Sequence, residues 1–454
     1  NNQSLLGSGN MTFGGSVTSA TAARTLTNGN SGTVTIGSII LTNGHFTQGA
    51  GSTLSLTNAS PFSGAGTFDA STNSNTVVYT GASAAIRATT YSNLTINGTG
   101  TATNSGSTTV NGTMTVSSAT TNNGTFTVNT ALSGSATLTQ GANAILNIGG
   151  SSGISTLDAS TNANTVKYTG ATQTVKAISY HNLEIFQNSG DAALGGTTTV
   201  KNTLTFTSGK LNIGAQNLIF GNSATAVSGA SATLYIIADG VGTVRKNGTS
   251  AAEASYTFAI GDGDEYSPIT LTFTDGSYAG SSSVKVTDAK HPNDESDFNY
   301  LTRYWTVIQT GYSAFTCDVV GTYLAGDITG TEASIKAAKY SGSLPWLKYA
   351  TLASNTLTAN GVTSFSAFSG IESSDPTVTI MPTPGSATVC TGGSVTLLAA
   401  GANGASPYTY AWGPATDLNM TTGASVISTP TANRTYTVTV TDANGFIGTI
   451  SQVV

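Results

Sequence analysis

Charged residues are scarce in this 454-residue chain: Asp, Glu, Lys and Arg together make up 8%, against about 25% in ordinary soluble domains. A net charge of −6 leaves no basic surface to neutralise phosphates, which argues against nucleic acid as a partner. No window approaches the roughly 20 consecutive apolar residues that a membrane-spanning helix needs, so we expect no membrane insertion. The polarity comes instead from Thr, Ser, Asn and 54 Gly residues.

Cysteine and helical patterns are also scarce. The two cysteines, Cys317 and Cys390, lie far apart in sequence, which predicts neither a disulfide framework nor a zinc site. No stretch of helical length repeats its apolar residues with a period of about 3.6 residues. Val, Ile and Thr occur throughout, with 17 Tyr and 15 Phe, so the chain can bury a core of residues that favour strands. We therefore expect a folded, all-β protein.

Residues 1–222 repeat internally. The segment DASTNSNTVVYTG at 69–81 returns as DASTNANTVKYTG at 158–170, with 11 of 13 positions identical at an offset of 89. Short runs such as Thr113–Val116 and Thr125–Val128 alternate apolar residues with hydroxyls, and Gly, Asn and Ser separate them. The sequence lacks the regularly spaced aromatic residues that mark the blades of a β-propeller. Its predicted strands are also too short to suit a string of β-sandwiches. The pattern favours a parallel β-helix, in which like charges stacked at the ~4.8 Å strand spacing would repel.

Composition divides the rest of the chain. Residues 223–372 hold 22 of the 36 charged residues, and alternating runs such as Ile269–Thr274 predict a β-sandwich. Residues 373–454 are punctuated by Pro, alternate at Tyr436–Thr441 and place Trp412 near their middle. These features predict an immunoglobulin-like (Ig-like) sandwich. The expected fold is thus a parallel β-helix, or solenoid, followed by two β-sandwich domains.

The repeated pattern NTVVYTG…YSNLTI, which returns as NTVKYTG…YHNLEI, resembles the repeats of very large surface adhesins of Bacteroidota. Many of those adhesins are exported by the type IX secretion system. The run from Tyr256 to Gly261 is similar to the sandwich that follows such repeats, and the run from Ala387 to Leu397 is similar to their PKD-like or Ig-like modules. Such modules commonly carry Cys in a closing Asn-Gly-Cys turn. This chain has Phe446 there, which implies that Cys390 lacks a disulfide partner.

Acidic residues cluster in two places in the middle region. Carboxylates spaced closely in a Gly-containing loop can bind Ca²⁺, so the first cluster is the candidate metal site: Asp262, Asp264 and Glu265. The second cluster comprises Asp294, Glu295 and Asp297. Neither matches EF-hand spacing, and two solvated loops are the alternative. Four aromatic residues are either a sugar-stacking platform or core: Tyr304, Trp305, Trp346 and Tyr349.

No set of residues indicates catalysis or a cofactor other than calcium. The first 150 residues contain three charged residues, Arg24, Asp69 and Arg87, too few for a two-carboxylate glycosidase site. Asp69 and Asp158 are repeat equivalents, which favours a role in turns. The three histidines are scattered, and no Ser-His-Asp arrangement stands out: His45, His181 and His291.

The sequence therefore predicts a non-catalytic, extracellular cell-surface adhesin or stalk, a segment of a larger secreted bacterial protein, with glycans or surfaces as partners. The alternative is a structural subunit of a self-assembling extracellular filament, whose copies bind each other end to end. A carbohydrate-active enzyme built on a β-helix is less favoured. An enzyme on this fold would need the clustered acids that the repeat region lacks.

Overall fold

The computed structural model describes residues 2–72, 74–223, 227–248, 255–276 and 280–454. Their regular structure is almost entirely β-strand, with two short 3-10 helices, η1 (Ala325–Asp327) and η2 (Glu332–Ser334). The expectation of an all-β protein is confirmed. In these residues no helix has the length and apolar character needed to cross a membrane.

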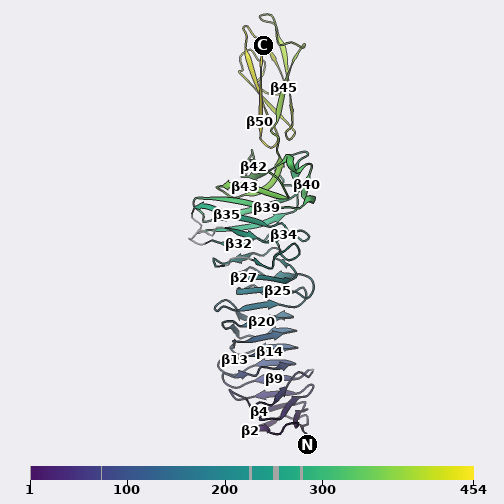
Figure 1. Cartoon of the computed structure of the whole chain (residues 1–454), viewed down its shortest axis with the longest axis vertical. Coiled ribbons are helices and arrows are strands. Elements are labelled where there is room, and N and C mark those ends of the chain that lie inside the picture. Colours follow the sequence, from purple (N-terminus) through teal and green to yellow (C-terminus); the bar gives the residue numbers. More distant parts are fainter. Residues whose placement is uncertain (1, 73, 224–226, 249–254, 277–279) are drawn as a thin grey trace. The chain divides into compact units, whose positions relative to one another are not determined.

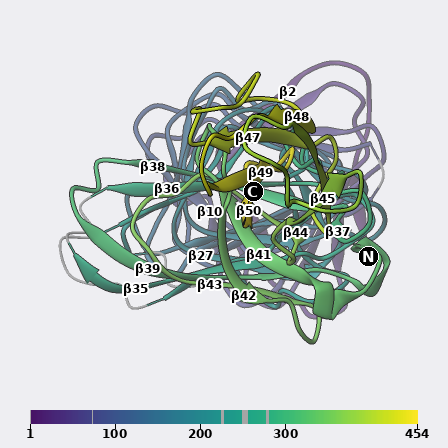
Figure 2. The ribbon, with the colours of Figure 1, turned by 90° about the horizontal axis from the view of Figure 1, so that it is seen from above.

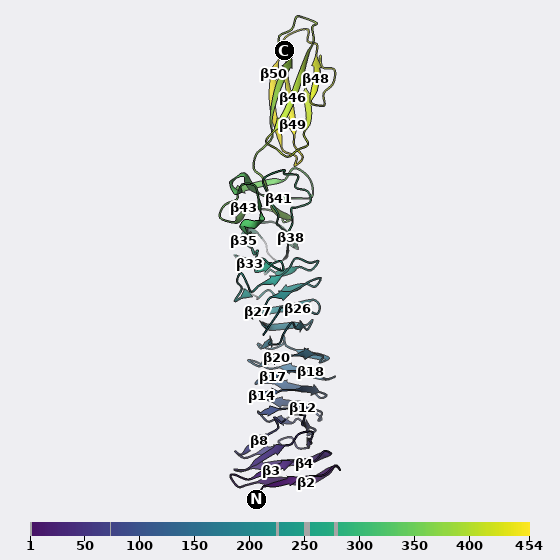
Figure 3. The same cartoon turned by 90° about the vertical axis from the view of Figure 1, so that its right-hand side faces the viewer.

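The chain divides into two compact units, residues 1–247 and 248–454. The first unit is a β-solenoid of about 12 turns, which confirms the predicted β-helix. Figures 1 and 3 show its strands stacked as successive rungs, from purple at the first coils to teal. Parallel pairing continues to Val244, which lies opposite Leu218, beyond the change of composition near residue 222.

The solenoid strands form parallel ladders. One ladder contains β1 (Gln3–Leu5), β3 (Thr25–Asn28), β5 (His45–Gln48) and β8 (Thr67–Asp69). A second contains β2 (Met11–Ser19), β4 (Thr33–Leu41), β6 (Thr53–Leu56), β7 (Phe62–Ser63), β9 (Thr76–Tyr79), β12 (Asn93–Ile96), β15 (Thr113–Val116), β18 (Ala131–Ser133) and β21 (Ser151–Ser152). A third contains β10 (Ala85–Ile86), β13 (Ala102–Asn104), β16 (Thr120–Asn122), β19 (Thr137–Gln140) and β22 (Thr156–Asp158).

Two further sets of strands form the remaining parallel ladders of the solenoid. One contains β11 (Thr90–Tyr91), β14 (Ser107–Val110), β17 (Thr125–Val128), β20 (Ile145–Ile148), β23 (Thr165–Tyr168), β25 (Ser179–Phe186), β27 (Thr198–Ser208), β29 (Leu218–Phe220), β30 (Val227–Ser228) and β32 (Val244–Asn247). The other contains β24 (Thr174–Val175), β26 (Ala192–Leu194), β28 (Leu211–Asn212) and β31 (Ile236–Ile237). Each turn visits three faces: β15, β16 and β17 lie in different ladders, and the next three strands pair with them in the same order.

Alternation along each short strand builds the solenoid core. The strand β15 has the sequence TMTV, with its two threonines half-buried and its Met and Val buried. Parallel pairing places Val77, Leu94 and Met114 in line on neighbouring coils, and each is 0% exposed. Small Thr and Ser hydroxyls on the outer face let the same pattern recur at every coil.

Amide side chains form a second, polar stack inside the solenoid. The Nδ2 of Asn104 donates to Oδ1 of Asn122 over 2.8 Å, and Nδ2 of Asn122 donates to Oε1 of Gln140 over 2.8 Å. All three residues are fully buried. Since an unpaired buried amide is costly, Asn122 and Gln140 each supply an acceptor for the amide of the previous coil, whereas Nε2 of Gln140 at the end of the stack has no partner among the described residues.

A pair of buried tyrosines recurs in both sequence copies, and we name it the tyrosine clasp. In the first copy the Arg87 backbone N–H donates to the Tyr79 hydroxyl over 3.0 Å. The Tyr79 and Tyr91 hydroxyls lie 2.7 Å apart, and the Tyr91 hydroxyl donates to the Arg87 carbonyl over 2.8 Å. Both polar groups of one backbone residue are thereby held by two phenols.

The second copy reproduces the clasp. Tyr168 accepts from the Lys176 N–H over 2.8 Å, Tyr180 donates to the Lys176 carbonyl over 2.8 Å, and the two hydroxyls lie 2.8 Å apart. The ring centroids are 6.4 Å apart in both clasps. The repeated YTG…Y pattern therefore encodes a structural module, and the clasped residue is basic in both copies.

The two copies do not lie on the same face of the solenoid. Strand β9 of the first copy belongs to the ladder β6-β9-β12, whereas its equivalent β23 belongs to the ladder β20-β23-β25. The ladders of β18 and β20 run side by side as separate faces of the same coils. A sequence repeat is therefore not a whole number of turns.

The second unit is built from antiparallel strands. A four-stranded sheet contains β33 (Tyr256–Phe258), β35 (Ile269–Gly276), β39 (Phe315–Thr322) and β43 (Thr356–Val362). A path of strands runs through β36 (Ser281–Thr287), β38 (Tyr304–Thr310), β44 (Ala367–Glu372), β41 (Ile335–Tyr340) and β42 (Leu347–Thr351). The short strands are β34 (Ile260–Gly261), β37 (Tyr300–Leu301) and β40 (Ile328–Thr329). Figure 2 shows β36 beside β38, and β35 beside β39.

Two three-stranded sheets complete this unit. They contain β45 (Thr377–Thr383), β46 (Val395–Ala402) and β48 (Ser425–Ser428), and β47 (Thr409–Gly413), β49 (Thr435–Thr441) and β50 (Ile447–Val453). Their shared core includes Trp412 and Tyr436. Cys317 is buried and Cys390 is exposed, and neither forms a disulfide, as the sequence predicts.

We predict that Tyr91→Phe and Tyr180→Phe destabilise the solenoid by similar amounts, about 1–3 kcal/mol each, because each removes a buried donor and leaves a carbonyl unpaired. Chemical denaturation followed by circular dichroism measures the change for each variant. A cost at one clasp and none at the other would contradict the structural equivalence of the two copies.

Candidate functional site

The predicted metal residues lie in a tight turn that follows β34. The Oδ1 atom of Asp262 accepts the backbone N–H groups of Asp264 and Glu265, both over 2.8 Å. This bonding fixes the turn and directs the second carboxylate oxygen of Asp262 toward the interior. Asp262 is 7% exposed, whereas Asp264 is exposed.

One buried guanidinium, that of Arg303, gathers four carboxylates. Its Nη1 donates to Asp262 over 2.6 Å and its Nε donates to Asp327 over 2.8 Å. Its Nη2 contacts Glu265, and also Asp288 over 3.4 Å. The Arg303 side chain is 0% exposed. The structure thus brings Asp262 and Glu265 together at Arg303, while Asp264 contributes its backbone to the turn.

The charged groups of this cluster shift one another's pKa values. Burial disfavours the charged form of Arg303, but the hydrogen bonds that Arg303 donates to Asp327 and Asp262 outweigh it and raise the pKa of Arg303. Burial would raise the pKa of Asp262, yet hydrogen bonds from Arg303 and the turn backbone lower it overall. Burial and the negative charge of Asp327 raise the pKa of Glu265. The pair Arg303–Asp262 is therefore the firmly ionised centre of the cluster.

The same carboxylates define what the cluster can bind. Asp262, Glu265 and Asp288 can each place one oxygen within 4.8 Å of the others. Calcium takes six to eight oxygens in proteins, and here the Arg303 guanidinium already supplies a positive charge to these groups. Calcium binding by Asp262, Asp264 and Glu265 stays a prediction.

The second acidic cluster forms a contact inside the second unit. Asp294 is 4% exposed, and its Oδ1 accepts from Nδ2 of Asn444 over 3.3 Å. The Glu295 N–H donates to Oδ1 of Asn444 over 2.9 Å, and the Ser406 hydroxyl donates to Asp297 over 2.7 Å. Asp294 and the Glu295 backbone thus join the loop at 290–297 to the turn between β49 and β50, and Asp297 joins it to the loop between β46 and β47.

The two tryptophans considered as a sugar platform lie in the core. Trp305 is 0% exposed and donates its indole N–H to the Ser267 carbonyl over 2.9 Å. Trp346 is 1% exposed and donates to the Asn293 carbonyl over 3.0 Å. Tyr304 and Tyr349 are only half-buried. The indole faces are therefore inaccessible to a sugar.

The repeat-equivalent acids of the solenoid hold turns, as their equivalence suggests. Oδ1 of Asp69 accepts from the Ser71 N–H over 2.9 Å and from its hydroxyl over 2.7 Å. Oδ1 of Asp158 accepts from the Ser160 N–H over 3.2 Å. In each copy the carboxylate serves the backbone of the loop that follows it.

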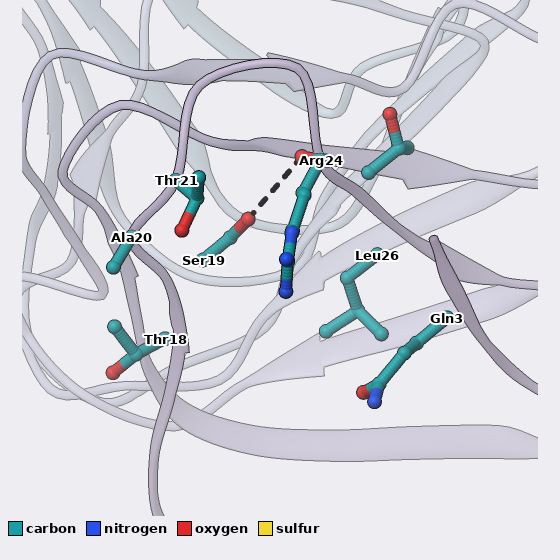
Figure 4. Close-up of a pocket in the computed structure, with 8 residues that line it drawn as sticks. Gln3, Thr18, Ser19, Ala20, Thr21, Arg24 and Leu26 are labelled. Atoms are coloured by element: carbon teal, nitrogen blue, oxygen red, sulfur yellow. Dashed lines mark hydrogen bonds between the residues drawn. The ribbon is translucent and has the colours of Figure 1, made fainter. Parts of the chain in front are cut away.

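Arg24 lines a small hollow in the first coils. Figure 4 shows its side chain extending between Thr18 and Gln3, with a hydrogen bond from the Ser19 hydroxyl to the Arg24 carbonyl, 3.5 Å long. The hollow has a volume of about 240 Å³ and is lined largely by hydroxyl and amide groups. It combines one positive charge with neutral polar groups, a combination suited to a polar ligand.

Sequence reasoning missed Arg303, Asp288 and Asp327. Arg303 was visible as a lone cation directly before the apolar strand β38, and a charge in that position needs a buried partner. The carboxylates of Asp327 and Asp288, which are partners of Arg303, lie in segments distant from it in sequence. Only the fold brings them together.

We predict that Arg303→Met destabilises the second unit by about 3–5 kcal/mol, since it leaves buried carboxylates without a counter-ion. Asp288→Asn is the matched control, because the Asp288 side chain is 58% exposed and surface pairs contribute about 0–1 kcal/mol. Urea denaturation measures both variants. Equal, small effects would show that the guanidinium does not hold the cluster together.

No protein-family model matches the chain, and neither the curated proteins nor the solved structures gave a match. The function proposed below therefore depends on the fold, on the side-chain chemistry and on the resemblance of the repeat pattern.

Proposed function

We propose that this protein is a non-catalytic stalk or adhesin of a bacterial cell surface, secreted to the exterior, with glycans or other surfaces as its partners. The observation that carries the proposal is the outer chemistry of the solenoid. Hydroxyls and amides pair along it, as between Thr115 and Ser133 over 3.3 Å and between Asn147 and Thr127 over 2.9 Å. Such a surface can exchange hydrogen bonds with sugar hydroxyls along its length.

The tyrosine clasps and Arg303 are consistent with a non-catalytic role. Burial raises the pKa of Tyr91 and of Tyr180 well above 10, so the clasps remain protonated at neutral pH. Arg303 is held in its charged form by carboxylates. General acid–base catalysis needs a group with a pKa near the working pH, and these groups are shifted away from it.

The proposal extends to the fold of the second unit. The sheets β45-β46-β48 and β47-β49-β50 enclose one core around Trp412 and Tyr436, an arrangement suited to an Ig-like or PKD-like sandwich. The antiparallel strands before them suit a β-sandwich. Together with the repeat pattern, these features support a relationship to large Bacteroidota adhesins and to export by the type IX system.

Weak sites acting together would give this protein its affinity. We predict that the soluble chain binds polysaccharide with a Kd in the millimolar range, whereas beads displaying many copies bind strongly, because linked sites raise the overall avidity about 10²–10⁴-fold above the affinity of a single site. Bead retention and calorimetry measure the two forms. Release of reducing sugar that one acidic substitution abolishes would contradict the proposal.

A structural filament is the second candidate, and the ladders provide the observation that favours it. Within the described residues β1 pairs with β3, β2 pairs with β4, and each stands at the end of its ladder. An open edge can pair with another strand. If the filament proposal holds, negative-stain electron microscopy of the purified chain will show long, regular fibres whose length grows with concentration. Separate rods at all concentrations favour the adhesin.

A further inference from the structure

The two tyrosine clasps hold basic residues that meet different surroundings. Each clasp fixes the backbone of one half-buried residue, Arg87 in the first copy and Lys176 in the second. The offset of 89 also aligns the two-residue strands β7 and β21. The side chains that border the clasped residue can therefore be compared position by position.

In the first copy the space beside the clasped residue is filled. The Arg87 guanidinium lies over the Phe62 ring, 5.2 Å from its centroid, and its Nη2 donates to the Gly66 carbonyl over 2.7 Å. The Phe62 ring packs on Phe68, with 4.7 Å between centroids. The charge and the planar face of the Arg87 guanidinium are thus both engaged by groups of the protein itself.

In the second copy the filling side chains are absent. Ser151 replaces Phe62, and Leu157 replaces Phe68. A hollow of about 560 Å³ lies here, lined by the backbone and side chains of residues 149–153 and 171–174 together with Lys176. Among the residues that the structure describes, the Lys176 ammonium has no hydrogen-bond or ion-pair partner.

Two buried glutamines, which the first copy lacks, build the floor of this hollow. Gln173 is 6% exposed, and its Nε2 donates to the carbonyls of Ile148 and Gly150 over 2.9 and 2.8 Å. Gln187 in turn donates to Oε1 of Gln173 over 3.2 Å. A Cβ at Gly150 would lie 1.8 Å from the Thr130 carbonyl oxygen, so position 150 has to be glycine. These contacts hold the hollow in shape without a ligand, so the site is preorganised.

The chemistry of the hollow defines its ligand. A single cation stands at its rim, and Ser, Thr and backbone amide groups line the rest. Its volume falls within the range of about 300–1,000 Å³ typical of small-molecule sites. We infer that this hollow binds one acidic sugar unit of a polysaccharide, with Lys176 pairing the carboxylate or sulfate and the hydroxyl groups meeting the sugar hydroxyls.

This inference rests on the proposed glycan-binding function and names the charged ligand class for one site. Among the described residues no acidic residue lines the hollow, and Lys176 is its one charged lining residue. Because the ammonium is only half-buried, the attraction is screened by salt. Binding should therefore weaken as ionic strength rises.

Calorimetric titration of the full chain tests the site with three probes: trigalacturonate, a sulfated galactose trisaccharide and neutral galactotriose. We expect the acidic probes to bind more tightly than the neutral one. Lys176→Met should weaken acidic binding by about tenfold or more, the loss expected for one charge-assisted hydrogen bond. The preferred acidic probe identifies whether a carboxylate or a sulfate is the natural group.

Two further variants complete the test. Lys201→Met removes the same charge from the same solenoid at a position whose Nζ donates to the Ser160 carbonyl, and it should leave binding unchanged. Ser151→Phe restores the side chain of the first copy and should block the hollow. Acidic binding that Lys176→Met leaves intact, neutral binding of equal strength, or no binding of any probe overturns the inference. The proposed function fails separately, if multi-copy beads retain no polysaccharide.

Discussion

Stacking in register is the constraint on which the solenoid depends. Parallel coils repeat at the strand spacing of about 4.8 Å, so a side chain in a paired strand lies against its counterpart on the next coil. Apolar residues then form continuous columns, as Val77, Leu94 and Met114 do. Amides bond to one another from coil to coil, as from Asn104 to Gln140. Like charges on adjacent coils would repel, which explains the hydroxyl-rich composition of the surface.

Charge is therefore sparse in the solenoid. Where charged residues do stack on adjacent coils, they can have opposite signs, as for Lys167 and Glu184, whose charged groups lie 2.8 Å apart. Arg87 and Lys176 occupy the stretches between short strands, each held by its clasp rather than by a ladder of similar residues. In the second unit, where strands run antiparallel, Arg303 lies in the interior with its four carboxylates. In these places particular neighbours fix the charged residue, through its backbone at Arg87 and Lys176 and through its side chain at Arg303.

The solenoid was predictable from sequence because its determinants are local and repeated. Runs such as Thr113–Val116 alternate with a period of two residues, and each run predicts one strand of one coil. The repeated YTG pattern marks the same structural module in each sequence copy. The acidic site was predictable only in part. Proximity in sequence grouped Asp264 with Asp262 and Glu265, but the other two carboxylates at Arg303, those of Asp288 and Asp327, come from segments that folding alone brings close. Burial likewise decided the role of Trp305 and Trp346 as core residues.

The mismatch between repeat length and whole turns has a genetic consequence. Unequal recombination between the two near-identical segments would insert or remove one complete copy. Because a copy ends on a different face from the one on which it begins, each such event would rotate every later coil about the solenoid axis. Copy number would then set both the length of the solenoid and the direction in which its later faces point. Lineages that differ by one copy would present the same hollow toward different directions.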